Sequence, residues 1–169
     1  MGGALMSDLD DSRDLQALRE RVAAARAGLA STPLSAERGA GPADPETGES
    51  WHRGNVLGHV SEMLDYWTAQ IQRAVEGSGT IGRDEKGVKS RREGIDHGDA
   101  TSERELKDRV DEKIGRVLVM LAAIEPDDLE RTVVFHNREG NREVRIGELL
   151  QTLIVSHLED HIEQLASLP

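Results

Sequence analysis

Hydrophobic residues recur at three- and four-residue spacing in four segments of the chain, residues 14–30, 51–76, 102–124 and 146–165. This spacing places apolar side chains on one face of an α-helix, so each segment is predicted to be an amphipathic helix with one buried face. The positions expected to face the core are Leu15, Leu18, Val22, Ala25 and Leu29; Val56, His59, Val60, Met63, Trp67 and Ala74; Leu106, Val110, Ile114, Val117, Leu121 and Ile124; and Ile146, Leu149, Leu150, Leu153, Ile154, His157, Leu158, His161, Ile162 and Leu165.

Two long connections interrupt the helical pattern. Residues 31–50 are rich in proline and glycine and cannot form a regular helix. Residues 77–100 combine several glycines with many charges, and a connection of this length is expected to be a crossover, a lid or a disordered segment. The pattern predicts an all-α fold, a four-helix bundle with long crossover connections.

Shorter patterns predict three local features. Ser102 precedes Glu105 at the spacing of a helix capping box, which marks the start of the third helix. Gly58 lies inside the second helix at a cost of about 1 kcal/mol relative to Ala, so a close backbone approach is expected there. Residues 132–146 are predicted to form a small extended hairpin before the last helix, with its turn at residues 138–141.

The length and composition favour one helical domain. A chain of 169 residues can bury a core of its own, and scarce aromatic residues leave that core to Ala, Leu, Val and Ile. We predict a disordered N-terminal segment over residues 1–13 and a single domain over residues 14–169.

Charge and cysteine content exclude several functions. A net charge of −11 argues against a phosphate-binding surface, so no nucleic-acid partner is expected. The densest basic run, "KGVKSRRE" at residues 86–93, is flanked by acids and is interpreted as a solvated loop. The absence of cysteine excludes a disulfide framework, a thiolate metal site and a thiol nucleophile. No segment is apolar enough to cross a bilayer and the N-terminus does not resemble a signal peptide, so a cytoplasmic protein without a membrane partner is expected.

Three histidines occupy buried positions of the predicted helices. His157 and His161 lie one turn apart on the same face of the last helix, and His59 lies on the inner face of the second helix. Buried imidazoles need hydrogen-bond partners or a metal ion, and three of them match the ligand count of an open metal site. We predict that His59, His157 and His161 bind a metal; the alternative is three structural histidines in the core.

Other polar residues are assigned no role in the site. His52 at a helix start is expected to be solvated and His97 to lie on the surface, whereas His136 could point either way. Glu62 and Asp65, near His59 in the sequence, are expected to face solvent.

Two known metal motifs do not fit. The zinc peptidase motif H-E-x-x-H needs Glu directly after its first His, and Leu158 holds that place. Carboxylate di-iron sites need a Glu-x-x-His pair on each of two helices, and no such pair recurs here.

Two stretches carry a resemblance to a known family. These are "WHRGNVLGHVSEMLDYW", with His59 on the inner face of the second helix, and "VRIGELLQTLIVSHLEDHIEQL", with an H-x-x-x-H pair on the last helix. Over most of its length the chain resembles the DinB/YfiT-like superfamily of metalloenzymes. The resemblance implies a four-helix bundle with crossover connections, frequently a homodimer. It also implies a divalent metal, commonly zinc or nickel, held by His59, His157 and His161.

The resemblance also suggests a function. Characterised branches are bacillithiol or mycothiol S-transferases and a mycothiol-dependent maleylpyruvate isomerase, which implies a small-molecule substrate and a low-molecular-weight thiol cofactor. The isomerase branch commonly has Glu where His157 stands. The leading hypothesis is a metal-dependent transferase that activates such a thiol for addition to an electrophile.

Three alternatives remain open at this point. They are a non-catalytic, stress-related metal- or ligand-binding protein, a mycothiol-dependent isomerase, and a structural bundle whose histidines are core residues. No catalytic arginine, second base or thiol-binding residue is identified. Trp51, Trp67 and residues 77–100 are considered as pocket walls, although core packing is the simpler explanation of both tryptophans.

Overall fold

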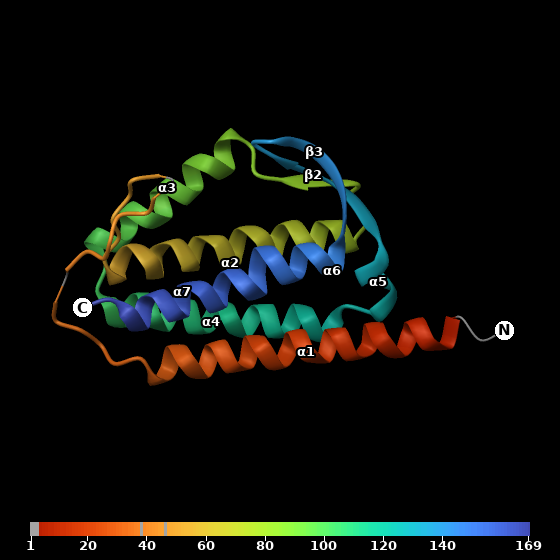
Figure 1. Ribbon diagram of the computed structural model, residues 1–169, viewed down its shortest axis with the longest axis horizontal. Coiled ribbons are helices and arrows are strands. Elements are labelled where there is room, and N and C mark those ends of the chain that lie inside the picture. The colour runs from red at the N-terminus through yellow and green to blue at the C-terminus, as the bar shows by residue number, and fades with distance from the viewer. Residues whose placement is uncertain (1–3, 38, 46) are drawn as a thin grey trace.

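The computed structural model describes residues 4–37, 39–45 and 47–169, and its fold is mostly helical (Figure 1). Four helical stretches run side by side along the long axis of the molecule, which confirms the predicted bundle. They are α1 (Ala4–Ser31), α2 (Arg53–Val75), α4 (Glu103–Ala123) and the continuous stretch made of α6 (Ile146–Leu149), η1 (Leu150–Ser156) and α7 (His157–Ser167). No described helix has the length and apolar character needed to cross a membrane.

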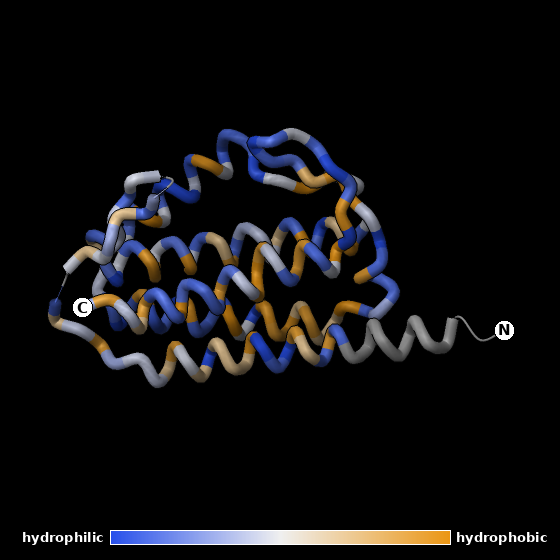
Figure 2. The backbone as a smooth tube through the Cα atoms, in the orientation of Figure 1, coloured by the Kyte–Doolittle hydropathy of each residue, from blue (hydrophilic) through white to orange (hydrophobic). Residues whose placement is uncertain are grey.

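The core lies between these four stretches. Every predicted core position is buried except Leu153, His157 and His161, which are half-buried. Figure 2 shows hydrophobic and hydrophilic residues alternating along these helices, as expected of amphipathic helices. Ser102 caps α4 as predicted, because its hydroxyl accepts a hydrogen bond from the Glu105 amide.

The first helix begins earlier than its apolar pattern indicates. The described backbone is helical from Ala4, not from Asp14. The predicted disorder of residues 1–13 stays a prediction, and residues 1–3 lie outside the described part of the chain.

Residues 77–100 contain secondary structure that the sequence pattern did not reveal. They form β1 (Thr80–Gly82) and α3 (Glu85–Ala100), so the crossover is largely helical. The interpretation of residues 86–93 as a loop is wrong, because they are helical, but most of them are exposed to solvent as predicted. The Asp84 carboxylate caps α3 by accepting a hydrogen bond from the Gly87 amide at 2.8 Å, which fixes the start of the helix.

Glycines allow α3 to pack directly on the backbone of α2. Gly54 and Gly58 of α2 face Gly94 and Gly98 of α3, and a Cβ built on any of the four would clash with the opposite helix. The close backbone approach predicted at Gly58 is therefore confirmed. Without side chains between them, the two helices lie closer than ordinary packed helices.

We expect Gly98→Ala to lower the free energy of unfolding by roughly 1–3 kcal/mol, despite the better helix propensity of Ala. The added Cβ would overlap the backbone carbonyl of Gly54, so the helices must separate. The matched control is Gly115→Ala in α4, whose Cβ would meet only the Arg26 guanidinium, at 3.8 Å. Urea unfolding should show Gly98→Ala less stable and Gly115→Ala unchanged or more stable; equal stabilities would contradict close packing.

A small sheet caps one end of the bundle. After the short helix α5 (Pro126–Glu130), β2 (Thr132–Asn137) and β3 (Gly140–Arg145) pair antiparallel, which confirms the predicted hairpin. β1 adds a third strand parallel to β2, which the sequence analysis did not predict. In Figure 1 the sheet and α3 lie on the side of α2 away from α1.

The last helical stretch is not a uniform α-helix. Its η1 part is a π-helix, whose wider turns rotate the following residues relative to an α-helix. As a result Val155 is fully buried, although the α-helical pattern did not place it on the inner face. This irregular segment ends at Ser156, directly before His157.

Candidate metal centre

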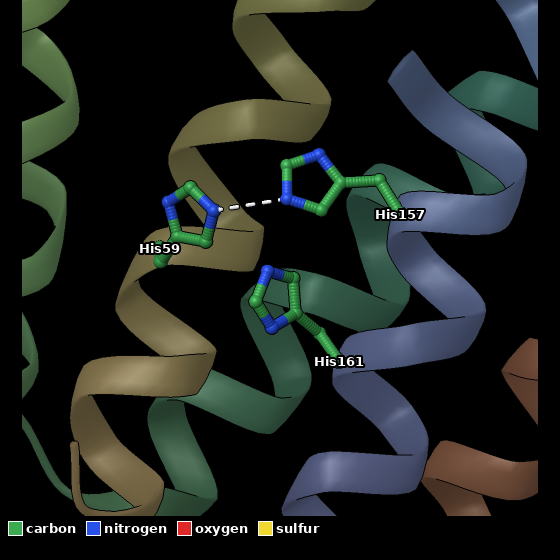
Figure 3. A group of neighbouring side chains, drawn as sticks. All are labelled: His59, His157 and His161. Carbon is green, nitrogen blue, oxygen red and sulfur yellow. Dashed lines mark hydrogen bonds between the residues drawn. The ribbon is translucent and has the colours of Figure 1, made fainter. Parts of the chain in front are cut away.

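The three predicted histidines meet in the interior of the bundle. His59 comes from α2, and His157 and His161 come from successive turns of α7 (Figure 3). One candidate ligand atom from each ring can be chosen so that all three lie within 4.8 Å of one another. The structure thus brings together the three histidines that the sequence analysis identified. Metal binding by these histidines stays a prediction.

The separation of the ring nitrogens suits a shared ion. The Nε2 atoms of His59 and His157 lie 3.3 Å apart. Two nitrogens that are each about 2.0–2.1 Å from one tetrahedral ion are about 3.3 Å apart, so this pair already has the required spacing. With two imidazoles from one helix and one from another, a fourth position remains for a molecule from outside.

Neighbouring groups orient two of the three rings. His161 Nδ1 lies 2.8 Å from Gln164 Oε1, so this nitrogen donates its hydrogen and Nε2 is left with a lone pair. The His157 ring is hydrogen-bonded to the backbone of Leu153. His59 Nδ1 is buried and has no hydrogen-bond partner among the described residues. In metal sites, a hydrogen bond from the second ring nitrogen of a histidine commonly holds the ring in position, as the bonds of His161 and His157 would do here.

The environment keeps the imidazoles neutral, as metal ligands must be. Burial, followed by the nearby His161 and His157, lowers the pKa of His59 to about 2. Burial and then His161 lower the pKa of His157 to about 4. Burial also lowers the pKa of His161, opposed by its hydrogen bond to Gln164. Protons therefore compete weakly for these nitrogens near neutral pH.

We expect the metal-free protein to lose stability as the pH falls below 6.5. The unfolded chain protonates its histidines near pH 6.5, whereas His59 and His157 in the fold resist protonation down to about 2 and about 4. The unfolded state thus binds more protons in this window, and stability falls by up to about 2 kcal/mol for each of the two between pH 7 and 5. Urea unfolding of chelator-treated protein measures it. His157→Ala should show a smaller loss, and an equal loss in both proteins would contradict the assignment.

One wall of the centre is aromatic, and an arginine lies against that wall. The Trp51 ring stacks on His161 with centroids 5.9 Å apart and lies 5.1 Å from the His59 ring. The Arg91 guanidinium, from α3, lies 5.6 Å from the centre of the Trp51 ring. Trp51 is thus a wall of the centre.

Several other expectations are corrected by the packing. His52 is not solvated: its ring caps α2 at the Gly54 amide and lies 2.6 Å from Asp99. Glu62 does not face solvent, because it forms a nearly buried ion pair with Arg83 at 2.8 Å.

The expectations for Asp65 and His97 are confirmed, and the structure places His136 and Trp67. Asp65 is exposed, as predicted, although it pairs with Lys113 at 2.6 Å. His97 is exposed, also as predicted, and His136 is half-buried on β2. Trp67 packs in the core against Phe135.

Two residues near the centre were missed by the sequence analysis. Gln164 follows His161 by three residues, a spacing that puts two side chains on one helical face and could have revealed the contact. Arg91 was overlooked because its segment was interpreted as a loop. The Asp84 cap and the four-residue spacing of Gly94 and Gly98, which matches that of Gly54 and Gly58, were the available signals.

Comparison with known proteins gives a family and two similar structures. The DinB superfamily profile matches residues 15–165. The crystal structure of a mycothiol-dependent maleylpyruvate isomerase has a TM-score of 0.68 and 18% identity, over 92% of this chain and 60% of that chain. The colibactin self-resistance protein ClbS, solved in complex with double-stranded DNA, has a TM-score of 0.64 and 13% identity, over 92% of each chain. No protein of curated function matches significantly.

These comparisons establish the family and the fold of the chain, but not its function. At such identities the two structures show a shared fold alone. The chain spans 60% of the length of the isomerase, so that protein's activity does not transfer with the fold.

Proposed function

The chain belongs to the DinB superfamily, and from this premise we propose that it is a divalent-metal-binding protein that activates a low-molecular-weight thiol for addition to an electrophile. The observation that carries the proposal is the convergence of His59, His157 and His161, with two Nε2 atoms at 3.3 Å. Mycothiol and bacillithiol are the thiols we propose to test.

The three imidazoles would hold the ion, and zinc or nickel suits neutral nitrogen ligands at this count. A divalent ion in this position lowers the pKa of a thiol bound to it, which supplies a nucleophile at neutral pH. Because the chain has no cysteine, the thiol must come from a small molecule.

The protein's own residues bind and orient the reactants. The low pKa values of His59 and His157 keep their lone pairs available, and Gln164 fixes the ring of His161. The Trp51 ring lies beside His59 and stacks on His161, so it borders one side of the centre. These residues arrange a metal site with one aromatic wall.

We do not propose the isomerase activity of the structural neighbour. His157 stands where that branch of the family commonly has Glu, and the chain spans only part of the neighbour's length. The homodimer and the cytoplasmic location stay predictions.

The test is a thiol-transfer assay with zinc- and nickel-loaded protein. Mycothiol and bacillithiol are each mixed with monochlorobimane, and the fluorescent thioether is followed with time. We expect turnover with one of the two thiols, lost on chelation and restored when the metal is returned. His161→Ala should reduce the rate at least about 100-fold, since ligand loss removes the ion.

The outcomes separate the competing functions. Bound metal without turnover for either thiol would favour the non-catalytic metal-binding protein. Turnover that persists in chelated protein and in His161→Ala would overturn the proposed role of the histidines.

A further inference from the structure

Arg91 lies against the Trp51 ring, which borders the metal centre. Its guanidinium carbon is 5.6 Å from the centre of that ring, which in turn stacks on His161. Its charge also acts on the centre, because it lowers the pKa of His59, His157 and His161 alike. Among the arginines that the structure describes, Arg91 is thus the one whose charge acts on all three imidazoles.

The charge of Arg91 is only partly neutralised. Among the described residues its nearest carboxylate is Glu49, at 3.9 Å, and the same carboxylate lies closer to Arg92, at 3.2 Å. Two guanidinium groups therefore share one acid and leave a positive charge. The Arg91 side chain is 36% exposed, so it can meet a solute without breaking a tight ion pair.

The other basic groups nearby are engaged differently. Arg83 is held by both oxygens of Glu62, at 2.8 and 3.1 Å, and lies against the Tyr66 ring. Arg92 is 61% exposed and pairs with Glu49 at 3.2 Å. Of these three arginines, Arg91 combines spare charge, partial exposure and contact with the Trp51 wall of the centre.

We propose that Arg91 binds a carboxylate of the substrate or thiol, so that the protein prefers reactants carrying an anionic group near the reacting sulfur. A guanidinium offers two parallel N–H donors that match the two oxygens of a carboxylate. The Trp51 ring neighbours both Arg91 and His161 and supplies a flat apolar surface for the carbon chain that joins the carboxylate to the thiol. This inference rests on the proposed function, since it concerns the same site.

The test compares two thiols that differ in charge. Zinc-loaded wild type, Arg91→Gln and Arg92→Gln are titrated calorimetrically with 3-mercaptopropionate and with its neutral analogue 3-mercaptopropionamide. We expect wild type to prefer the acid over the amide by about tenfold. Arg91→Gln should reduce that preference to within about twofold. Arg92→Gln is the matched control, because it also loses a partner of Glu49 and should keep the preference.

Each outcome bears on the inference. Equal affinities of wild type for the two thiols, or a preference that survives in Arg91→Gln, would overturn the role of Arg91 and leave thiol binding intact. No binding of either thiol to zinc-loaded protein would overturn both this inference and the proposed function. Zinc content measured on the same samples shows whether loss of the metal is the cause.

Discussion

Untagged His157→Ala is expected to retain less than about a tenth of the divalent metal that the wild-type protein carries. Wild type should hold about one ion per chain, because three imidazoles meet there, and removing one leaves two ligands. Bound metal at 1,000 times its Kd stabilises a fold by about 4 kcal/mol, or roughly 10 °C in Tm at this chain length. The variant should lose this metal-dependent rise in Tm.

Elemental analysis by mass spectrometry, with Tm measured before and after chelation, checks this result. His97→Ala is the control, because His97 is exposed on α3 and is not one of the three imidazoles. It should bind as much metal as wild type. Equal metal content in wild type and His157→Ala, or none in wild type after reconstitution, would return the histidines to a structural role.

Arg53→Met is expected to destabilise the protein by about 3–5 kcal/mol, the cost of leaving one buried partner of an ion pair alone. The Arg53 side chain is 6% exposed and donates to Glu103 at 2.6 and 3.0 Å. It also donates to the backbone carbonyls of Pro33 at 2.7 Å and Leu165 at 2.9 Å. One side chain thus ties the start of α2 to α4, to the first connection and to the C-terminal turn of α7.

Two further variants test the cause of the loss. The first tests whether it comes from the unpaired Glu103, and the second tests whether it depends on burial of the ion pair. Arg53→Met combined with Glu103→Met removes both charges and should recover part of the stability. Arg116→Met breaks the exposed pair with Glu112, whose side chains are 61% and 65% exposed, and should cost no more than about 1 kcal/mol. Urea unfolding measures all three, and equal losses for the buried and the exposed pair would contradict the role of burial.

The amino-acid sequence by itself determined the four bundle helices and the three histidines. Amphipathic spacing repeats along the chain over many residues, so helix position and buried face are local properties that can be read without a fold. His157 and His161 are four residues apart on one helix, which makes their common face a consequence of helix geometry alone. His59 could be placed on an inner face in the same way.

Only the tertiary structure decided which residues surround those histidines. α3 has few apolar residues and owes its position to glycines that meet glycines of α2, a pairing between distant segments that no local pattern reports. Arg91 is part of α3, so its position against Trp51 follows from the packing of that helix. Likewise Trp51 precedes α2 in the sequence, and only chain packing lays it on His161. Contacts between segments far apart in sequence depend on how the whole chain packs, which is why the neighbours of the imidazoles required the fold.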